Sequence, residues 1–134
     1  MQENLTRLPD ITVVVCSYNH EKWIERCIRS LTHQDYLSQL DYEVVLVEDG
    51  SNDNTKVILE NLGCIPNLRI LINDRNMGLP TSLNRAIRSA RGRYVIRVDS
   101  DDYVARETLF YMKLFLDKNR HYQGVACDYV MVSP

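Results

Sequence analysis

The sequence lacks several features that would assign it to a particular class of proteins. Among its 134 residues, the longest hydrophobic run is ITVVVC (residues 11–16), which is too short to span a bilayer. The first residues, MQENLTRLPD, contain no hydrophobic stretch of the kind found in a signal peptide. The four cysteines form no CxxC pair, so we expect free thiols rather than disulfides or a zinc site. These absences favour a cytoplasmic protein, with the inner face of the membrane as the alternative location.

No excess of charge points to a charged partner. Lys and Arg number 16 against 18 Asp and Glu, and the resulting net charge of −2 argues against a nucleic-acid partner. Hydrophobic residues make up 45% of the chain, as is typical of one globular domain. The arginine-rich segment RSARGRYVIR (residues 88–97) is most simply a solvated helix end. Contact with a phosphate or with an anionic membrane, as in a peripheral membrane protein, is the alternative.

Two phosphate-binding motifs are also absent. The sequence contains no GxGxxG and no GxxxxGK[ST], so no glycine-rich loop of either kind is available to bind phosphate through backbone amides. A bound diphosphate would therefore need a different counter-charge, and a divalent cation on carboxylates is the simplest one.

The chain does contain a regular alternation of short hydrophobic runs and amphipathic segments. The runs are rich in β-branched residues and too short for helices, so they predict buried strands, whereas the segments between them place hydrophobic residues on one helical face. The predicted strands are residues 11–16, 42–48, 68–73, 93–99 and 124–132, and the predicted helical segments are residues 17–34, 51–63, 79–90 and 106–119. This order predicts an α/β fold of three layers, in which a mainly parallel sheet lies between helices.

Polar residues follow each of the first four predicted strands. Since parallel strands end at the same edge of a sheet, we expect these clusters to lie together, at the edge where open α/β sheets bind ligands. Carboxylates at separate strand ends could accept hydrogen bonds from a base and a ribose and could bind a metal ion. The clusters are CSYNH (16–20), EDGSND (48–53), NDRNMG (73–78) and DSDD (99–102).

The DSDD cluster brings together three carboxylates, those of Asp99, Asp101 and Asp102. Such like charges destabilise one another unless a cation lies among them. Their hard oxygen atoms suit Mg²⁺ or Mn²⁺, which also bind phosphate oxygens and stabilise a departing diphosphate. A solvated acidic turn that caps the next helix is the alternative interpretation, and EDGSND is equally compatible with an ordinary turn.

Three segments, taken together and in order, resemble a known family. They are ITVVVCSYNHEKWIERCIRSL, YEVVLVEDGSNDNT and NMGLPTSLNRAIRSARGRYVIRVDSDD, and they resemble the GT-A glycosyltransferases of family 2 over about residues 11–128. The resemblance implies a Rossmann-like GT-A fold and an inverting enzyme that transfers a sugar from a nucleotide-diphosphate sugar. UDP-sugars are the expected donors, with GDP- and dTDP-sugars as alternatives. The acceptor would be a sugar or a lipid-linked molecule that the sequence does not identify.

The resemblance also implies roles for individual residues. Tyr18 would lie against the nucleotide base, and Asp49 would accept a hydrogen bond from it. Asp101 would bind Mg²⁺ or Mn²⁺, supported by Asp99, which lies near the ribose, and by Asp102. The residues that the resemblance places around the nucleotide are Cys16, Tyr18, Asn19, Asp49, Gly78, Asn84 and Asp99.

The chain departs from the family pattern in sequence and in length. Glu48 replaces the usual Asp, and LPTS (residues 79–82) replaces a stretch that is commonly rich in Ala. Family members continue beyond Pro134 with the acceptor pocket and the catalytic base. We therefore expect residues 1–10 to be an N-terminal extension and residues 11–134 to be the nucleotide-sugar-binding part of a truncated domain.

Two other functions remain open at this point. A chain without the catalytic base would be a nucleotide-sugar-binding module without activity. A sugar nucleotidyltransferase would have a similar α/β sheet and a similar metal site. That class usually has a glycine-rich, basic loop after its first strand, whereas CSYNHEK contains no glycine.

Overall fold

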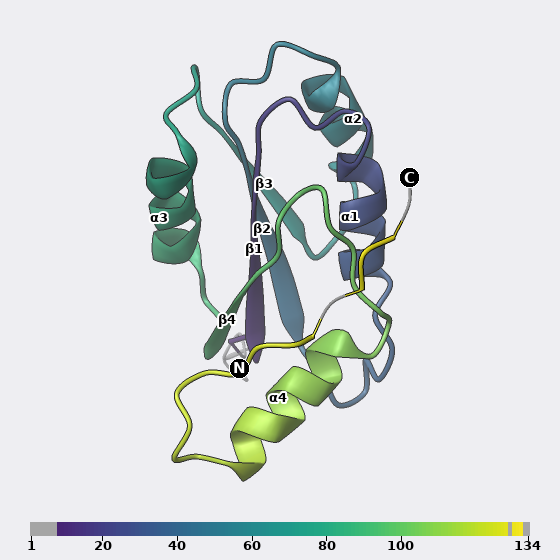
Figure 1. The fold of residues 1–134 in the computed structure, drawn as a ribbon, viewed down its shortest axis with the longest axis vertical. Helices are drawn as coiled ribbons and strands as arrows, with labels where there is room; N and C mark the ends of the chain where they lie inside the picture. The colour runs from purple at the N-terminus through teal and green to yellow at the C-terminus, as the bar shows by residue number, and fades with distance from the viewer. Residues whose placement is uncertain (1–7, 129, 133–134) are drawn as a thin grey trace, which may run out of the picture.

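The computed structural model describes residues 8–128 and 130–132, and strands alternate with helices along this part of the chain (Figure 1). The strands are β1 (Ile11–Ser17), β2 (Tyr42–Glu48), β3 (Leu68–Ile72) and β4 (Tyr94–Arg97). The helices are α1 (Ile24–Thr32), α2 (Thr55–Leu62), α3 (Leu79–Ser89) and α4 (Thr108–Lys118). The predicted α/β order is confirmed over these eight elements.

The strands form one parallel sheet in the order β3-β2-β1-β4. β1 pairs along its whole length with β2 and pairs with β4 on its other side, while β3 pairs with the outer side of β2. The two central strands are the most continuously hydrophobic because helices cover both of their faces. In β1, for example, Val13, Val14 and Val15 are all fully buried.

Helices on both faces of the sheet produce three layers. α1 and α2 pack on one face and α3 packs on the other, as Figure 1 shows. Alternate side chains of β1 therefore enter different cores. Val13 and Val15 belong to the core that includes Ile28 of α1, whereas Val14 packs with Ala86 of α3. The predicted arrangement of a parallel sheet between helices is confirmed.

The predicted fifth strand is not formed in the described part of its range. Residues 124–128 and 130–132 join no sheet and are mostly exposed. GVACDYVMV has the composition of a strand, but such a segment is stable as a strand only where a neighbouring strand pairs with it. β4 is also shorter than predicted, because it ends at Arg97, although Val98 still donates one backbone hydrogen bond to Val14 (3.1 Å).

The residues just before β1 already contact the sheet. The Asp10 backbone N–H donates to the Asp41 carbonyl (2.8 Å), and the Asp10 carbonyl accepts from the Tyr94 N–H (2.9 Å). Residues 1–7 of the predicted N-terminal extension lie outside the described residues. Among the helices that the structure describes, none is long and hydrophobic enough to cross a membrane.

Candidate nucleotide-sugar site

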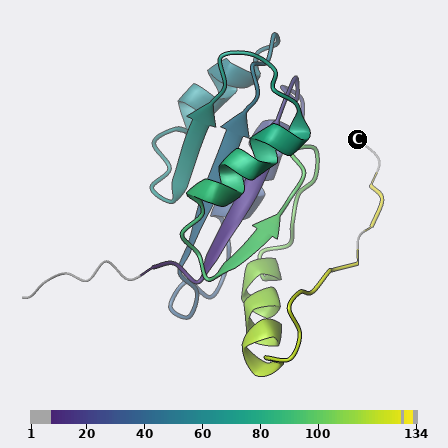
Figure 2. The same ribbon diagram turned by 90° about the vertical axis from the view of Figure 1, so that its left-hand side faces the viewer.

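The four predicted polar clusters lie at one edge of the sheet, as expected for parallel strands. Figure 2 shows the strand arrows pointing the same way, toward the loops that follow them. The cluster after β1 supplies Tyr18, an aromatic side chain that is 37% exposed at this edge. The structure thus presents an accessible ring next to the ends of β2 and β4, where a planar base could stack.

The loop after β1 is hydrogen-bonded to the loop after β2. Asn19 has a left-handed backbone (φ 55°), a conformation that Asn tolerates better than most residues. Its backbone N–H donates to the Ser51 hydroxyl (3.0 Å), and its side-chain oxygen accepts from the Asn52 N–H (2.8 Å). Asn19 therefore shapes the loop that carries Tyr18. The contact with the base implied for Asn19 stays a prediction.

Cys16 is half-buried near the end of β1. Burial raises the pKa of its thiol to about 11, while the Arg97 guanidinium opposes this shift and the carboxylates of Asp49 and Asp99 add to it. At neutral pH the thiol is therefore in its protonated form, which is the poorly nucleophilic form. These charges around one sulfur atom also show that the structure brings the ends of β1, β2 and β4 together.

Glu48 and Gly50 shape the turn that leaves β2. The Glu48 carboxylate is 1% exposed and accepts hydrogen bonds from the backbone N–H groups of Gly50 (3.2 Å) and Ser51 (2.6 Å). Gly50 is left-handed (φ 73°), and a Cβ atom there would lie 2.4 Å from the backbone carbon of Arg75. Only glycine permits this close approach of the loops after β2 and β3.

Asp49, the carboxylate predicted to accept a hydrogen bond from the base, faces into the protein. It is 3% exposed and accepts hydrogen bonds from Asn73 Nδ2 (2.6 Å), Met77 N–H (2.8 Å) and Gly78 N–H (3.0 Å). Burial by itself would raise the pKa of Asp49, but these hydrogen bonds together with one from Ser82 lower it below its usual range. Asp49 thus holds the loop after β3, including Gly78, against the end of β2. Its contact with a base stays a prediction.

Asn73 extends this network toward α3. Its side-chain N–H₂ donates to the Ser82 hydroxyl (2.8 Å) as well as to Asp49, and its side-chain oxygen accepts from Arg85. Arg85 also donates to the carbonyl of Ile72 (2.7 Å). The start of α3 is therefore tied to the ends of β2 and β3 through polar side chains that are largely buried.

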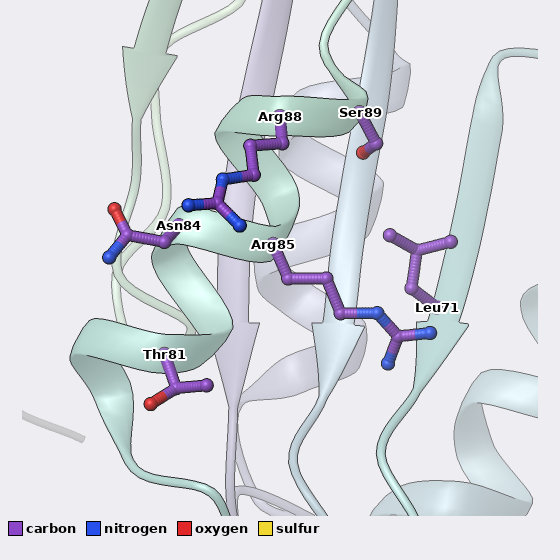
Figure 3. A pocket seen from close by; sticks show the side chains of 6 residues that line it. All are labelled: Leu71, Thr81, Asn84, Arg85, Arg88 and Ser89. Carbon is purple, nitrogen blue, oxygen red and sulfur yellow. The ribbon is translucent and has the colours of Figure 1, made fainter.

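Asn84, another residue that the resemblance places around the nucleotide, lies on α3 next to Arg85 of this network. It is exposed on α3 and lines a pocket of about 600 Å³, together with Arg85 and Arg88 (Figure 3). Figure 3 shows the side chains of Asn84, Arg85 and Arg88 projecting from α3. The role of Asn84 at the nucleotide stays a prediction.

The DSDD cluster forms a tight turn after β4. The Asp102 N–H donates to the Asp99 carbonyl (3.0 Å). Ser100 is buried, and its hydroxyl is hydrogen-bonded to Nδ1 of His20 (2.5 Å), so the loop after β1 holds the centre of the turn. The side chains of Asp101 and Asp102 are exposed and, within the described residues, take part in no hydrogen bond or ion pair.

Asp101 and Asp102 are therefore the carboxylates most available to a cation. Within residues 8–128 and 130–132, no group of three His, Cys, Asp or Glu side chains is placed to hold a metal ion. Mg²⁺ at nucleotide sites usually takes only one or two carboxylates and completes its coordination with phosphate oxygens and water, and Mn²⁺ suits the same ligands. The two exposed carboxylates fit that mode of binding, in which the nucleotide completes the site. Their assignment as metal ligands stays a prediction.

Two contacts at this edge were not predicted from the sequence. One is the His20–Ser100 hydrogen bond, and the other is the ion pair between Arg97 and Asp99 (2.7 Å). The ion pair has a sequence signal, because residues two apart on a strand lie on the same face. The hydrogen bond has none, since it joins residues 80 apart in the chain.

The comparison with known families identifies the chain. The sequence profile described as glycosyl transferase family 2 matches residues 12–131. The chain belongs to this family. The resemblance noted in the sequence is confirmed, and the four-stranded parallel sheet is that of a GT-A glycosyltransferase, as in the solved relatives below.

Curated members of glycosyl transferase family 2 match over most of this chain. The poly(ribitol-phosphate) β-N-acetylglucosaminyltransferase TarS of Staphylococcus aureus (strain Mu50) is 38% identical over 109 residues, which are 81% of this chain and 19% of TarS. The chondroitin synthase of Escherichia coli is 33% identical over 126 residues, which are 93% of this chain and 17% of the synthase. The chain therefore spans less than a fifth of the length of these two relatives.

Solved structures of family members share the fold. The crystal structure of S. aureus TarS 1–349 in complex with UDP-GlcNAc has a TM-score of 0.75 and 38% identity, covering 83% of this chain and 32% of that one. The structure of the mannosyltransferase PcManGT from Pyrobaculum calidifontis, in complex with GDP-Man and Mn²⁺, has a TM-score of 0.72 and 31% identity. The match covers 83% of this chain and 33% of PcManGT.

Proposed function

We propose that this chain is the nucleotide-sugar-binding part of an inverting glycosyltransferase, which transfers a sugar from a nucleotide-diphosphate sugar to an acceptor with the help of Mg²⁺ or Mn²⁺. The observation that carries the proposal is that the side chains at the carboxyl edge of the sheet fall into a buried group and an exposed group. Asp49 and Glu48 face inward and fix the loops, whereas Tyr18, Asp101 and Asp102 are exposed at the same edge.

Each exposed group has a role in binding the donor. The ring of Tyr18 stacks against the base, and Asp99 accepts a hydrogen bond from the ribose. Asp101, with Asp102 beside it, would hold Mg²⁺ or Mn²⁺. When bound, the cation supplies positive charge that stabilises the nucleoside diphosphate as a leaving group. The hydrogen bonds between the loops hold these groups in position before the donor arrives, which lowers the entropy cost of binding. The proposal assigns the general base to none of these residues.

The solved relatives support a nucleotide-sugar donor and leave its base open between two candidates. TarS structures contain UDP-GlcNAc or UDP, whereas the mannosyltransferase structure contains GDP-Man and Mn²⁺. We favour a UDP-sugar, because the TarS structures are 38% identical to this chain and the mannosyltransferase is 31% identical. The acceptor is a sugar or a lipid-linked molecule, reached at the inner face of the membrane or in the cytoplasm.

Thermal unfolding with nucleotides tests the donor site. UDP, GDP and dTDP are each added with and without Mn²⁺ to the wild type, to Asp101→Ala and to Asp74→Ala, a control that removes an exposed carboxylate from the neighbouring loop. A nucleotide at a hundredfold excess over its dissociation constant stabilises the folded protein by about 2.7 kcal/mol. We expect a Mn²⁺-dependent rise in melting temperature for one nucleotide, absent in Asp101→Ala and retained in Asp74→Ala.

A second measurement separates an enzyme from a binding module. Release of UDP from UDP-GlcNAc and of GDP from GDP-Man is followed with Mn²⁺ present. Turnover by this chain that Asp101→Ala abolishes supports a glycosyltransferase. Nucleotide binding without any turnover supports the binding module, and the absence of a thermal shift with all three nucleotides contradicts the donor site itself.

A further inference from the structure

Arg97 is the cation that directly contacts the DSDD turn in the described part of the chain. It is the last residue of β4, and its side chain points to the same side as Asp99 because residues two apart on an extended chain share a face. Its Nε and Nη2 atoms lie 2.9 Å and 2.7 Å from Oδ1 of Asp99. The two side chains are 48% and 51% exposed, so the pair lies at the surface where a nucleotide and a cation would enter.

We propose that Arg97 is a positioning residue that makes cation binding depend on the nucleotide. In the absence of nucleotide, the guanidinium occupies the carboxylate of Asp99 and opposes the entry of a divalent cation at Asp101. When a diphosphate binds, its negative charge offsets that of the guanidinium, and cation and nucleotide then bind together. This inference rests on the proposed function, because it concerns the same donor site.

The charges at the turn support this role. The three carboxylates of DSDD would attract a divalent cation even without nucleotide. Arg97 pairs with one of them through Oδ1 of Asp99 and adds a positive charge, which is permanent because an arginine side chain does not lose its proton in proteins. Two exposed carboxylates, Asp101 and Asp102, remain for the cation, and phosphate oxygens must supply the rest of its coordination.

The neighbouring basic residues have other partners. Arg93 lies near the start of the same strand and pairs with Asp117 of α4 (3.1 Å). Arg26 stacks over the ring of Tyr103 at 4.4 Å from its centroid. Arg93 is therefore a matched control for Arg97, since each is an exposed arginine of the β4 region paired with one carboxylate.

Mn²⁺ binding to the full chain tests the inference. The unbound Mn²⁺ is measured by its electron paramagnetic resonance signal, with and without UDP, for the wild type, Arg97→Gln, Arg97→Lys and Arg93→Gln. GDP replaces UDP if GDP is the nucleotide that stabilises the protein. Exposed ion pairs contribute little to stability, so all variants are expected to fold, and their melting temperatures are checked first.

The expected result is weaker coupling between Mn²⁺ and nucleotide binding, rather than a general loss of Mn²⁺ affinity. Arg97→Gln should bind Mn²⁺ without nucleotide about three- to tenfold more tightly than the wild type, as expected for the removal of a nearby like charge and a competing partner. Mn²⁺ affinity in the presence of UDP should change little, so the factor by which UDP strengthens Mn²⁺ binding should fall by the same amount. By linkage, the factor by which Mn²⁺ strengthens UDP binding should fall equally. Arg97→Lys keeps the charge and should stay within about twofold of the wild type, as should Arg93→Gln.

Other results overturn the inference, and they do so in distinguishable ways. If the wild type binds Mn²⁺ with nucleotide but Arg97→Gln shows unchanged or weaker Mn²⁺ binding without nucleotide, Arg97 does not control the cation and the proposed function stands. The same holds if Arg93→Gln changes Mn²⁺ binding as much as Arg97→Gln does. If the wild type binds no Mn²⁺ with UDP, GDP or dTDP, both the inference and the proposed donor site fail.

Discussion

Replacement of Asp49 by Asn tests whether this carboxylate holds the edge of the sheet together. The variant keeps the size of the side chain and removes its charge. It also places an N–H₂ group opposite three donors, namely Asn73 Nδ2 and the backbone N–H groups of Met77 and Gly78. Because one of the two carboxylate oxygens becomes a donor, at least one of these hydrogen bonds must break.

The expected loss of stability follows from which donors have a second acceptor. Gly78 N–H also donates to Asn76 (2.8 Å), and Asn73 Nδ2 also donates to Ser82 (2.8 Å), so both stay partly satisfied. Met77 N–H has no other hydrogen bond within the described residues and depends on the carboxylate. The remaining amide oxygen can take the place of Oδ1, which accepts from both Asn73 and Met77, so the bond from Gly78 to Oδ2 is the one that breaks. The bonds that stay lose the charge of their acceptor. A hydrogen bond to a charged group contributes about 1.5–3 kcal/mol, so we expect Asp49→Asn to lower the free energy of unfolding by about 1.5–3 kcal/mol.

The loss should depend on pH, since the pKa of Asp49 is lowered in the folded protein. A carboxyl group whose pKa is lower in the folded than in the unfolded state stabilises the protein fully above the unfolded value, about 3.9 for Asp. This contribution decreases as the pH falls through the folded pKa, where the wild-type carboxyl becomes protonated. The difference between wild type and Asp49→Asn should therefore be largest near pH 7 and shrink below about pH 4.

Urea unfolding followed by circular dichroism measures the loss of stability and its pH dependence, at pH 7 and at a series of lower pH values. Asp74→Asn is the control, because Asp74 is an exposed carboxylate in the loop that follows β3. Surface changes of this kind usually alter the free energy of unfolding by less than about 0.5 kcal/mol. A loss for Asp49→Asn no larger than that of the control, or a loss that is constant from pH 7 to pH 3, would refute the reasoning.

Two further predictions concern the loops around the site. Gly50→Ala should lower the free energy of unfolding by about 3 kcal/mol or more in urea unfolding, because its Cβ would lie 2.4 Å from the Arg75 backbone at a left-handed φ of 73°. Gly124→Ala, where nothing lies within 4 Å, should have little effect, and equal losses would contradict this account. His20→Ala leaves the buried Ser100 hydroxyl without its partner, so Mn²⁺-dependent nucleotide affinity should fall severalfold by calorimetric titration. An unchanged affinity would show that this hydrogen bond does not position the DSDD turn.

The sheet could be predicted from the sequence because its central strands are specified locally. ITVVVC and YEVVLVE are continuous, β-branched and short, and β1 (Ile11–Ser17) and β2 (Tyr42–Glu48) follow these runs almost to the residue. The segment GVACDYVMV has a similar composition, yet its described residues form no strand. The difference lies in pairing, which depends on the neighbouring chain and cannot be read from a segment alone.

The candidate site could be located from the sequence, but its internal contacts could not. The edge follows from parallel strands, and DSDD and Tyr18 follow from position along the chain. The inward orientation of Asp49 follows from a backbone that turns at Gly50 and Gly78, both with positive φ, and brings the loop after β3 over the carboxylate. Such loop conformations arise from contacts between residues far apart in sequence, whereas periodicity reports only on helices and strands.

The orientation of the side chains at this edge divides the expected mutational effects into two classes. Glu48 and Asp49 are buried and hold backbone N–H groups, so their replacement should reduce stability and, through displaced loops, nucleotide affinity together. Tyr18 and Asp101 are exposed, so their replacement should reduce nucleotide affinity with little change in stability. If replacing Tyr18 or Asp101 reduced stability but left nucleotide affinity unchanged, the edge would be a structural turn rather than a binding site.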